Sequence, residues 1–407
     1  MWFLAAWASW AWLWIASPAW AELPAEQIGR VEVLPQPAQA HWVWVSDVIL
    51  RRSALVDLDS GRMLGMLNGG FGPTVALFSA SRGEIYVPET HYSRGSRGER
   101  ADVLTIYDGA SLAAVAEVAL PPRRAINALP MANAALSDDE RFAAIFNSVP
   151  GTSLSIVDVE QRALKAEVTT PGCSLVYAAG PRRFALLCGD GSLLLLTLDG
   201  EGRELAKTRS HPFFDPDADP VTEKAVRVGD EWLFVSFEGR VHPVDVSGAE
   251  PRFGEPWSLL DETDRADSWR IGGSQHLAVH EASQRLYSLV HQGGPDTHKD
   301  PGTELWVYDL ATRARVERVA LRSPGVTFLG EPIELGGGGR LWGWLLDSFL
   351  GAGIDTIAVT QDAEPLLVTA SGFSGGLGLY DARSGEFLRR VYCGNLTIVA
   401  LQAPFAP

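Results

Sequence analysis

One phrase recurs seven times along the chain and limits the folds that it can adopt. In each copy a short apolar strand ends in Asp or an equivalent residue, a turn follows, and a second strand comes after the turn. Alternating apolar residues on both sides of a Gly, Asp or Ser turn are typical of a β-hairpin. The chain is therefore predicted to repeat one hairpin-based unit. The copies begin at residues 54, 103, 153, 192, 239, 304 and 376.

Further strand-like runs lie between these phrases, among them RFAAIFNSV, EWLFVSF, RLYSLVH and PLLVTAS. Four strands in each unit and seven units predict an all-β fold, a seven-bladed β-propeller. A β-sandwich could use similar strands, but like phrases spread over the whole chain favour radial repetition. Because no low-complexity linker interrupts the run, we expect a single domain over residues 22–407.

The first residues, MWFLAAWASWAWLWIASPAWA, predict export. They are apolar to Ala21, and Ala19-Trp20-Ala21 has the small-x-small pattern that precedes a signal-peptidase cut. We expect a signal peptide over residues 1–21, cleaved after Ala21, and a periplasmic protein. No Lys or Arg precedes the apolar run, and an uncleaved membrane anchor is the alternative.

The net charge of −16 argues against a nucleic acid partner, whose phosphates need a basic face.

Two of the three cysteines, Cys173 and Cys188, lie in the strand-like runs CSLVYA and RFALLC. Centring the intervening loop on Gly180-Pro181 places the two cysteines opposite each other, within disulfide range. An exported chain would meet an oxidising compartment. The sequence thus predicts a Cys173–Cys188 disulfide, with two buried free thiols as the alternative. Cys393 is left over and is expected to stay reduced.

Groups that could carry chemistry are sparse. His276, His280, His291 and His298 cluster in sequence. Because metal ligation needs converging ligands, we interpret these as polar strand and loop histidines and predict no metal site. The carboxylates of DETDRAD at 261–267 are interpreted as part of a solvated loop, since acid/base pairs must converge in space. No catalytic residue is predicted on this chain.

Several longer stretches resemble the heavy subunit of the quinoprotein amine dehydrogenases, the methylamine and aromatic amine dehydrogenases. They are HYSRGSRGERADVLTIYD (91–108), GCSLVYAAGPRRFALLCGDGSL (172–193), DETDRADSWRIGGSQHLAVH (261–280) and QDAEPLLVTASGFSGGLGLYDARSGEFLRRV (361–391). The resemblance runs over nearly all of the chain after the signal peptide. HPFFDPDADP at 211–220 inclines it toward the aromatic amine branch.

The resemblance implies an α2β2 assembly with a small subunit that carries tryptophan tryptophylquinone. Such an enzyme deaminates primary amines, aromatic or short aliphatic, to aldehyde and ammonia. Electrons then pass to a cupredoxin of the amicyanin or azurin type or to a cytochrome c. The heavy chain would hold no cofactor of its own. This agrees with the prediction that no catalytic residue lies on this chain. The family also pairs two heavy-chain cysteines within one blade.

GGFGP at 69–73 resembles the family's Gly-Gly-Phe segment, whose Phe lines the substrate channel, and the resemblance gives that role to Phe71. Gly72 departs from the pattern, because the family commonly has a larger apolar residue there. Two other functions stay open on the sequence. One is a non-catalytic exported propeller that binds or scaffolds a partner, and the other is a self-sufficient hydrolase of the lactonase kind.

Overall fold

The computed structural model describes residues 33–72, 75–126, 131–322, 353–372, 376–394 and 396–404, with the backbone alone of 327–328 and 331–332. The chain divides into two units, and all of the described strands lie in the second, Leu34–Pro407. The predicted signal peptide lies outside the described residues. Within those residues, no helix is long and apolar enough to cross a membrane.

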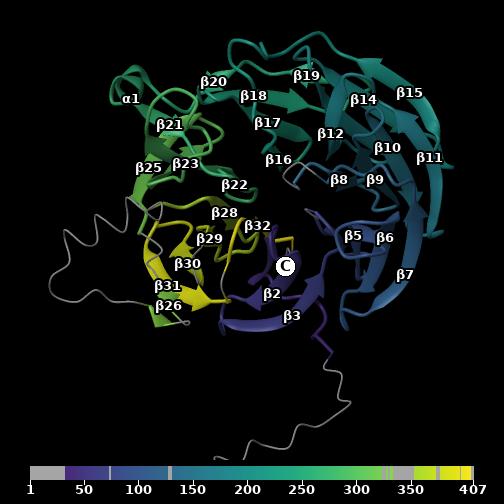
Figure 1. Ribbon diagram of the computed structural model, residues 1–407. Helices are drawn as coiled ribbons and strands as arrows, with labels where there is room; N and C mark the ends of the chain where they lie inside the picture. Colours follow the sequence, from purple (N-terminus) through teal and green to yellow (C-terminus); the bar gives the residue numbers. More distant parts are fainter. Residues whose placement is uncertain are drawn as a thin grey trace, which may run out of the picture. The chain divides into compact units, whose positions relative to one another are not determined.

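Seven sheets of four or five strands form the blades of a propeller within the second unit (Figure 1). The prediction of an all-β, seven-bladed propeller is confirmed. The first blade contains β32 (Val399–Gln402), β1 (Trp42–Asp47), β2 (Arg52–Asp57) and β3 (Arg62–Asn68). The second contains β4 (Leu77–Ser79), β5 (Glu84–Tyr92), β6 (Arg100–Asp108) and β7 (Ala114–Leu120). The third contains β8 (Ala134–Leu136), β9 (Phe142–Asn147), β10 (Ser153–Asp158) and β11 (Ala163–Thr169). The fourth contains β12 (Cys173–Ala178), β13 (Arg183–Cys188), β14 (Leu193–Leu198) and β15 (Glu204–Arg209).

The remaining blades follow in the same order along the chain. The fifth contains β16 (Val226–Val228), β17 (Glu231–Val235), β18 (Arg240–Asp245), β19 (Arg252–Phe253) and β20 (Trp257–Ser258). The sixth contains β21 (Trp269–Ile271), β22 (Leu277–His280), β23 (Arg285–Gln292), β24 (Glu304–Asp309) and β25 (Ala314–Ala320). The seventh contains β28 (Thr356–Val359), β29 (Leu366–Ala370), β30 (Gly376–Asp381) and β31 (Phe387–Tyr392). A short helix, α1 (Glu262–Ala266), precedes β21, and β26 (Thr327–Phe328) pairs with β27 (Glu331–Pro332).

The seven repeated phrases lie in the third and fourth strands of the seven blades. In this count β21 and β22, which both pair with β23, share the first position of the sixth blade, and β19 and β20, which both pair with β18, share the fourth position of the fifth. The recurrence of Asp in the phrases has a structural explanation. In each phrase the Asp carboxylate accepts a hydrogen bond from a backbone N–H two or three residues further on. Examples are Asp108 to Ser111, Asp158 to Gln161 and Asp309 to Thr312. Such Asx turns fix the hairpin. In six blades the register between the third and fourth strands also shifts by one residue just before this turn. These β-bulges increase the twist of each blade.

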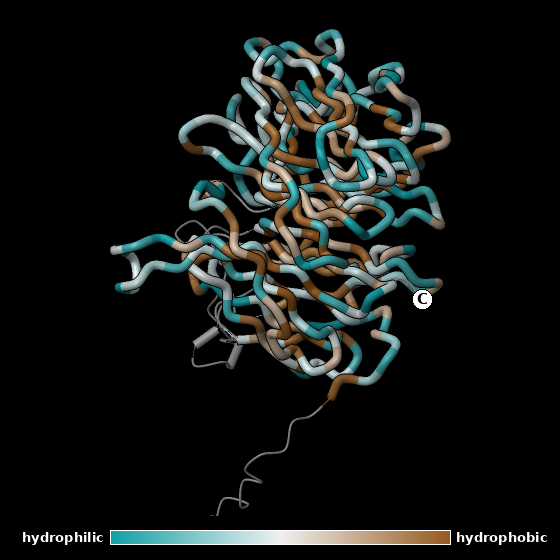
Figure 2. The backbone as a smooth tube through the Cα atoms, turned by 90° about the vertical axis from the view of Figure 1, so that its right-hand side faces the viewer, coloured by the Kyte–Doolittle hydropathy of each residue, from teal (hydrophilic) through white to brown (hydrophobic). Residues whose placement is uncertain are grey.

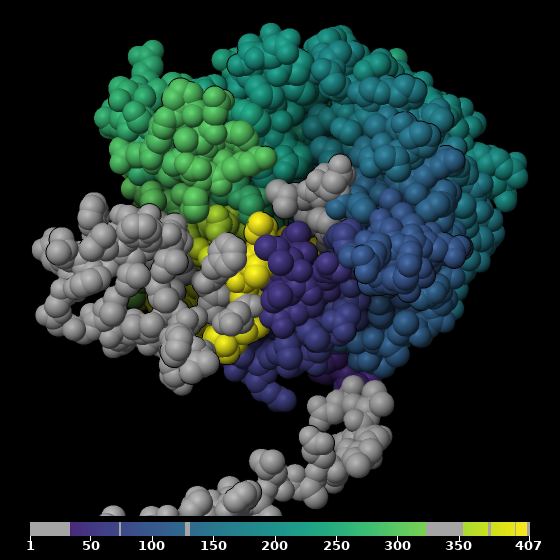
Figure 3. Space-filling view, viewed as in Figure 1, coloured from purple at the N-terminus to yellow at the C-terminus, as the bar shows by residue number. Residues whose placement is uncertain are grey.

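The first blade closes the ring, because β32 comes from the C-terminus and pairs with β1. In the space-filling view the yellow C-terminal residues lie against the purple N-terminal blade (Figure 3). The innermost strands of successive blades pack on one another, for example β22 on β28 and β28 on β32. The ring is thus completed by hydrogen bonds between the two ends of the repeat.

The core lies between neighbouring blades. In β1, Val43 and Val45 pack toward the seventh blade, whereas Trp42 and Trp44 pack toward the second blade. Successive side chains of a strand point to opposite faces. Both faces of β1 are therefore buried, one against each neighbouring blade. The fourth strand of each blade is more exposed, and in Figure 2 the apolar brown segments are enclosed by hydrophilic teal loops.

Cys173 and Cys188 are joined by a disulfide with an S–S distance of 2.04 Å. They are directly paired across β12 and β13, in the register that the sequence predicts. A bulge between Ser174 and Tyr177 then shifts the register by one residue nearer the turn. Cys393 is a free thiol, and burial raises its pKa to about 12.

Each blade has two ends, because its strands alternate in direction. The turns from second to third strand and the links to the next blade lie at one end, which we term the connection end. The turns from first to second and from third to fourth strand lie at the other, which we term the hairpin end.

Candidate functional site

Phe71 lies at the connection end, in the link from the first blade to the second. Its N–H donates to the carbonyl of Thr90, 2.5 Å away. The Tyr92 ring meets the half-buried Phe71 ring edge-on, with centroids 5.2 Å apart. The Arg51 guanidinium lies 4.6 Å from the centroid of the Phe71 ring. The Phe71 ring is therefore held between two blades by contacts on two sides.

A buried network of charged side chains, which contains Arg124, Asp102 and Arg100, supports the Phe71 loop. The Arg124 guanidinium donates to the Phe71 carbonyl at 3.2 Å and to Thr90 Oγ1 at 3.1 Å. Asp102 accepts from Thr90 Oγ1 at 2.8 Å and from the Arg100 side chain at 2.8 and 2.9 Å. Arg124 is only 2% exposed, and burial lowers its pKa to about 10 against the opposing charge of Asp102. The network fixes the backbone of Phe71 to the second blade.

The glycines beside Phe71 are required by close contacts. A Cβ on Gly70 would lie 2.3 Å from the Thr90 carbonyl oxygen. Gly72 has φ +81°, and a Cβ there would lie 2.9 Å from Cβ of Ile126. Ile126 therefore occupies the space that a larger residue at position 72 would need. The departure from the family pattern at Gly72 has a local steric explanation.

A cavity of about 220 Å3 lies along the innermost strands β8, β12, β16 and β22. Lys224 Nζ is buried in its wall, 3.3 Å from Glu223 Oε1, and burial lowers the Lys224 pKa. Tyr177 donates to the Glu223 carbonyl at 3.0 Å. Trp232 donates to the Ala178 carbonyl at 2.7 Å. Most of the polar wall is thus occupied by internal contacts.

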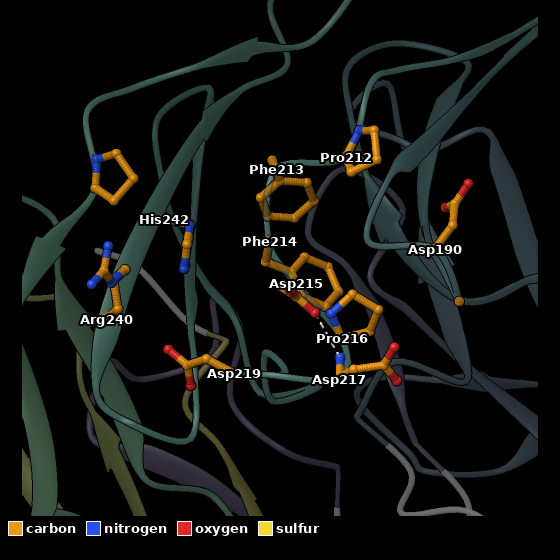
Figure 4. Close-up of a pocket in the computed structure, with 12 residues that line it drawn as sticks. Asp190, Pro212, Phe213, Phe214, Asp215, Pro216, Asp217, Asp219, Arg240 and His242 are labelled. Atoms are coloured by element: carbon orange, nitrogen blue, oxygen red, sulfur yellow. Dashed lines mark hydrogen bonds between the residues drawn. The ribbon is translucent and has the colours of Figure 1, made fainter.

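The HPFFDPDADP stretch lines a cleft of about 780 Å3 between the fourth and fifth blades (Figure 4). The cleft also lies at the connection end, since the links and turns of that end form it. Phe213 stacks on Phe253 with centroids 5.0 Å apart. His242 is 7% exposed, its Nδ1 makes no hydrogen bond, and burial lowers its pKa.

The carboxylates of this cleft hold its own loops. Asp215 accepts from the backbone N–H groups of Asp217 and Ala218, the first of which is dashed in Figure 4. Asp219 accepts from the Ser236 hydroxyl at 2.7 Å. These bonds fix the shape of an acidic recess rather than pair an acid with a base.

The interpretation of the DETDRAD stretch was wrong in part, although Asp261, Glu262 and Asp267 are exposed. The DETDRAD stretch forms α1 rather than a solvated loop, and Asp264 is buried because its carboxylate accepts from Arg315 at 2.7 Å. His276 lies in a loop and His280 in β22, and both are buried: His276 Nε2 lies 3.1 Å from Thr222 Oγ1. Burial and the nearby Lys224 charge set the His276 pKa well below its usual value. Among the described residues, no group of three or more His, Cys, Asp or Glu side chains could hold a metal ion.

The sequence is similar to those of known proteins. The family described as "Methylamine dehydrogenase heavy chain (MADH)" matches residues 39–324. The methylamine dehydrogenase heavy chain of Paracoccus versutus is 29% identical over 370 residues, which cover 88% of this chain and 78% of that protein. That of Methylophilus methylotrophus is 26% identical over 339 residues, covering 83% of this chain and 76% of that protein.

Solved structures share the fold at low sequence identity. A Kuenenia stuttgartiensis hydrazine synthase chain superposes with a TM-score of 0.55 at 11% identity, covering 89% of this chain and 99% of that chain. A dihydro-heme d1 dehydrogenase, NirN, gives a TM-score of 0.51 at 16% identity, covering 91% of this chain and 77% of that chain. These likenesses support the propeller architecture alone.

Proposed function

Because this chain belongs to the family of methylamine dehydrogenase heavy chains, we propose that it is the heavy subunit of a periplasmic amine dehydrogenase. The enzyme would oxidise a primary amine, aromatic or short aliphatic, by R–CH2–NH2 + H2O → R–CHO + NH3 + 2 H+ + 2 e−. The electrons would go to a cupredoxin or a cytochrome c. The observation that carries this proposal is the family match over residues 39–324.

The heavy chain would act with a small subunit in an α2β2 assembly. The small subunit would carry tryptophan tryptophylquinone, which supplies the electrophilic carbonyl and stores the two electrons. Export would follow from a signal peptide cleaved after Ala21. The role of this chain would be to present the small subunit with a rigid surface and to form part of the substrate channel.

Phe71 would form that channel wall. Its ring is held by Arg51 and Tyr92, and its backbone is held by Thr90 and Arg124. A residue whose ring and backbone are both fixed can select substrates by shape, because its ring does not move aside for a larger amine. The half-buried ring would also shield the bound amine from water.

The purified chain is expected to fold but to oxidise no amine. Catalysis needs a carbonyl electrophile and a base within hydrogen-bond reach of the amine, and the proposal assigns both to the small subunit. Dye-linked amine oxidation is to be measured for the chain over residues 22–407 alone and after co-expression with the small subunit and its maturation proteins. Activity only in the co-expressed assembly, with quinone absorbance on the small chain, is the expected result. Turnover by the isolated chain without added cofactor would contradict the proposal.

Phe71→Ala is expected to change amine preference more than stability. One ring or methylene contact contributes about 1–3 kcal/mol to discrimination, so ratios of kcat/KM should shift by roughly ten- to a few-hundredfold. The ratios are to be measured in the co-expressed assembly for methylamine, phenylethylamine and tyramine. Tyr392→Ala, at a 51% exposed aromatic residue of β31, is the matched control. Unchanged ratios in Phe71→Ala would return this residue to a purely structural role.

A further inference from the structure

A second large cavity lies at the hairpin end, between the first and second blades. Its volume is about 640 Å3, and its walls are mostly apolar, with Trp42, Trp44, Leu55, Phe78 and Ile85 among the lining residues. Small-molecule sites commonly have volumes of about 300–1,000 Å3 and this kind of lining, with a few placed polar groups. The cavity lies at the opposite end of the blades from Phe71.

One of the lining residues, Trp44, contains a hydrogen-bond donor without an acceptor. Trp44 is completely buried, and its indole Nε1 makes no hydrogen bond. The indole N–H can only donate. Polar atoms buried in proteins are bonded with few exceptions, so such a donor calls for a partner.

An acceptor without a donor lies directly beside it. Gln402 is the cross-strand partner of Trp44 in the pairing of β1 with β32. Directly opposed side chains project from the same face of a sheet, with Cβ atoms about 4.5–5.5 Å apart. Gln402 Nε2 donates to the Ala76 carbonyl at 3.0 Å, which identifies the other end of the amide as the oxygen. That oxygen, Oε1, is buried and makes no hydrogen bond.

The other buried or partly buried polar side chains that line this cavity have partners. Ser79 Oγ donates to Glu140 at 2.8 Å. Glu84 accepts from Tyr86 at 2.8 Å and from Arg162 at 2.9 Å. The Trp44 donor and the Gln402 acceptor therefore stand out as an adjacent pair in an otherwise satisfied, apolar pocket.

We propose that this cavity binds a planar apolar molecule that carries one hydroxyl group, and that phenols are the matching chemical class. A hydroxyl oxygen accepts one hydrogen bond and its hydrogen donates another. The phenol oxygen would accept from Trp44 Nε1, and its O–H would donate to Gln402 Oε1. The ring would pack near Trp44 and Phe78, whose own ring centroids are 5.8 Å apart.

The test compares p-cresol with toluene, which has the same ring and methyl group but no hydroxyl. Both are titrated into the purified chain, with binding followed by calorimetry and ligand-observed NMR. Saturable 1:1 binding of p-cresol, about tenfold tighter than toluene, is expected from one satisfied donor–acceptor pair. The assay needs neither the small subunit nor turnover, so its result is independent of the redox function.

Two variants locate the binding site. Trp44→Phe keeps an aromatic ring and removes the N–H, and Gln402→Met keeps the side-chain length and removes the acceptor. Each should weaken p-cresol binding by about five- to tenfold and change toluene binding by less than about twofold. Trp232→Phe is the matched control, because the Trp232 N–H is bonded to Ala178, and it should leave both affinities unchanged.

Three results would overturn the proposal: equal affinities for p-cresol and toluene, no saturable binding of either, or unchanged p-cresol affinity in Gln402→Met. Thermal melting checks that each variant is folded. If Trp44→Phe does not fold, Gln402→Met decides the question, since Gln402 lies at the end of β32 and is only partly buried.

Discussion

Asp102→Asn is expected to lower the free energy of unfolding by about 3–5 kcal/mol, the usual cost of breaking a buried ion pair. The Asp102 carboxylate accepts from the Arg100 side chain, from Thr90 Oγ1 and from the Arg124 backbone N–H. Asparagine removes the charge and turns a donor toward the arginine side chains. Arg124 would then stay buried without the carboxylate that most favours its charged form.

Urea unfolding at neutral pH measures this loss. Glu99→Gln is the matched control, because Glu99 is an exposed carboxylate in the turn between β5 and β6 of the same blade. Charge removal at such an exposed position usually changes stability by less than about 0.5 kcal/mol. A loss in Asp102→Asn no larger than that in Glu99→Gln would show that the network does not stabilise the second blade.

Replacing both Cys173 and Cys188 with alanine is expected to lower the free energy of unfolding by about 3 kcal/mol. The disulfide closes a loop with a sequence separation of 15 residues, and a loop of this length gives about that value in the chain-entropy model. Both sulfurs are buried in the core shared by the third and fourth blades. Losing the bond therefore acts on the unfolded chain as well as on this core.

Reductant provides the internal control for the disulfide. Unfolding in urea with dithiothreitol should lower the midpoint of the natural chain and leave the double variant unchanged. Cys393, whose pKa is raised by burial, should not react with iodoacetamide at pH 8 in the folded protein. A natural chain with the same midpoint with and without reductant would contradict the stabilising role of the bond.

The repeating parts of this fold could be predicted from the sequence because their causes are local. The Asp that ends each third strand bonds the turn that follows it, and the alternating apolar residues identify the strand itself. Burial of both faces of such a strand, as in β10, comes from the neighbouring blades. The pairing of Cys173 with Cys188 is equally local, since one hairpin joins them. The bulge beside it was not predictable, because Leu175 adopts φ +64° without a glycine to signal it.

The candidate site was predictable only in part, because contacts distant in sequence build it. Phe71 was named from a resemblance, but its support by Arg124 crosses 53 residues. Asp264 was read as solvated, since the Arg315 that buries it lies 51 residues away. The burial of His276 was not predicted, because nothing beside it in sequence reveals the Thr222 hydroxyl, 54 residues earlier. Contacts between residues so far apart in the sequence leave no pattern that a single sequence reveals.

The pairing of β1 with β32 also sets the order in which the molecule can be completed. During synthesis three strands of the first blade are made early, but its innermost strand, Val399–Gln402, is made only after the strands of the other six blades. Until then the N-terminal blade has only three of its strands, and its edge is open to a wrong partner. The first blade therefore cannot be completed until all of the other blades have been synthesised.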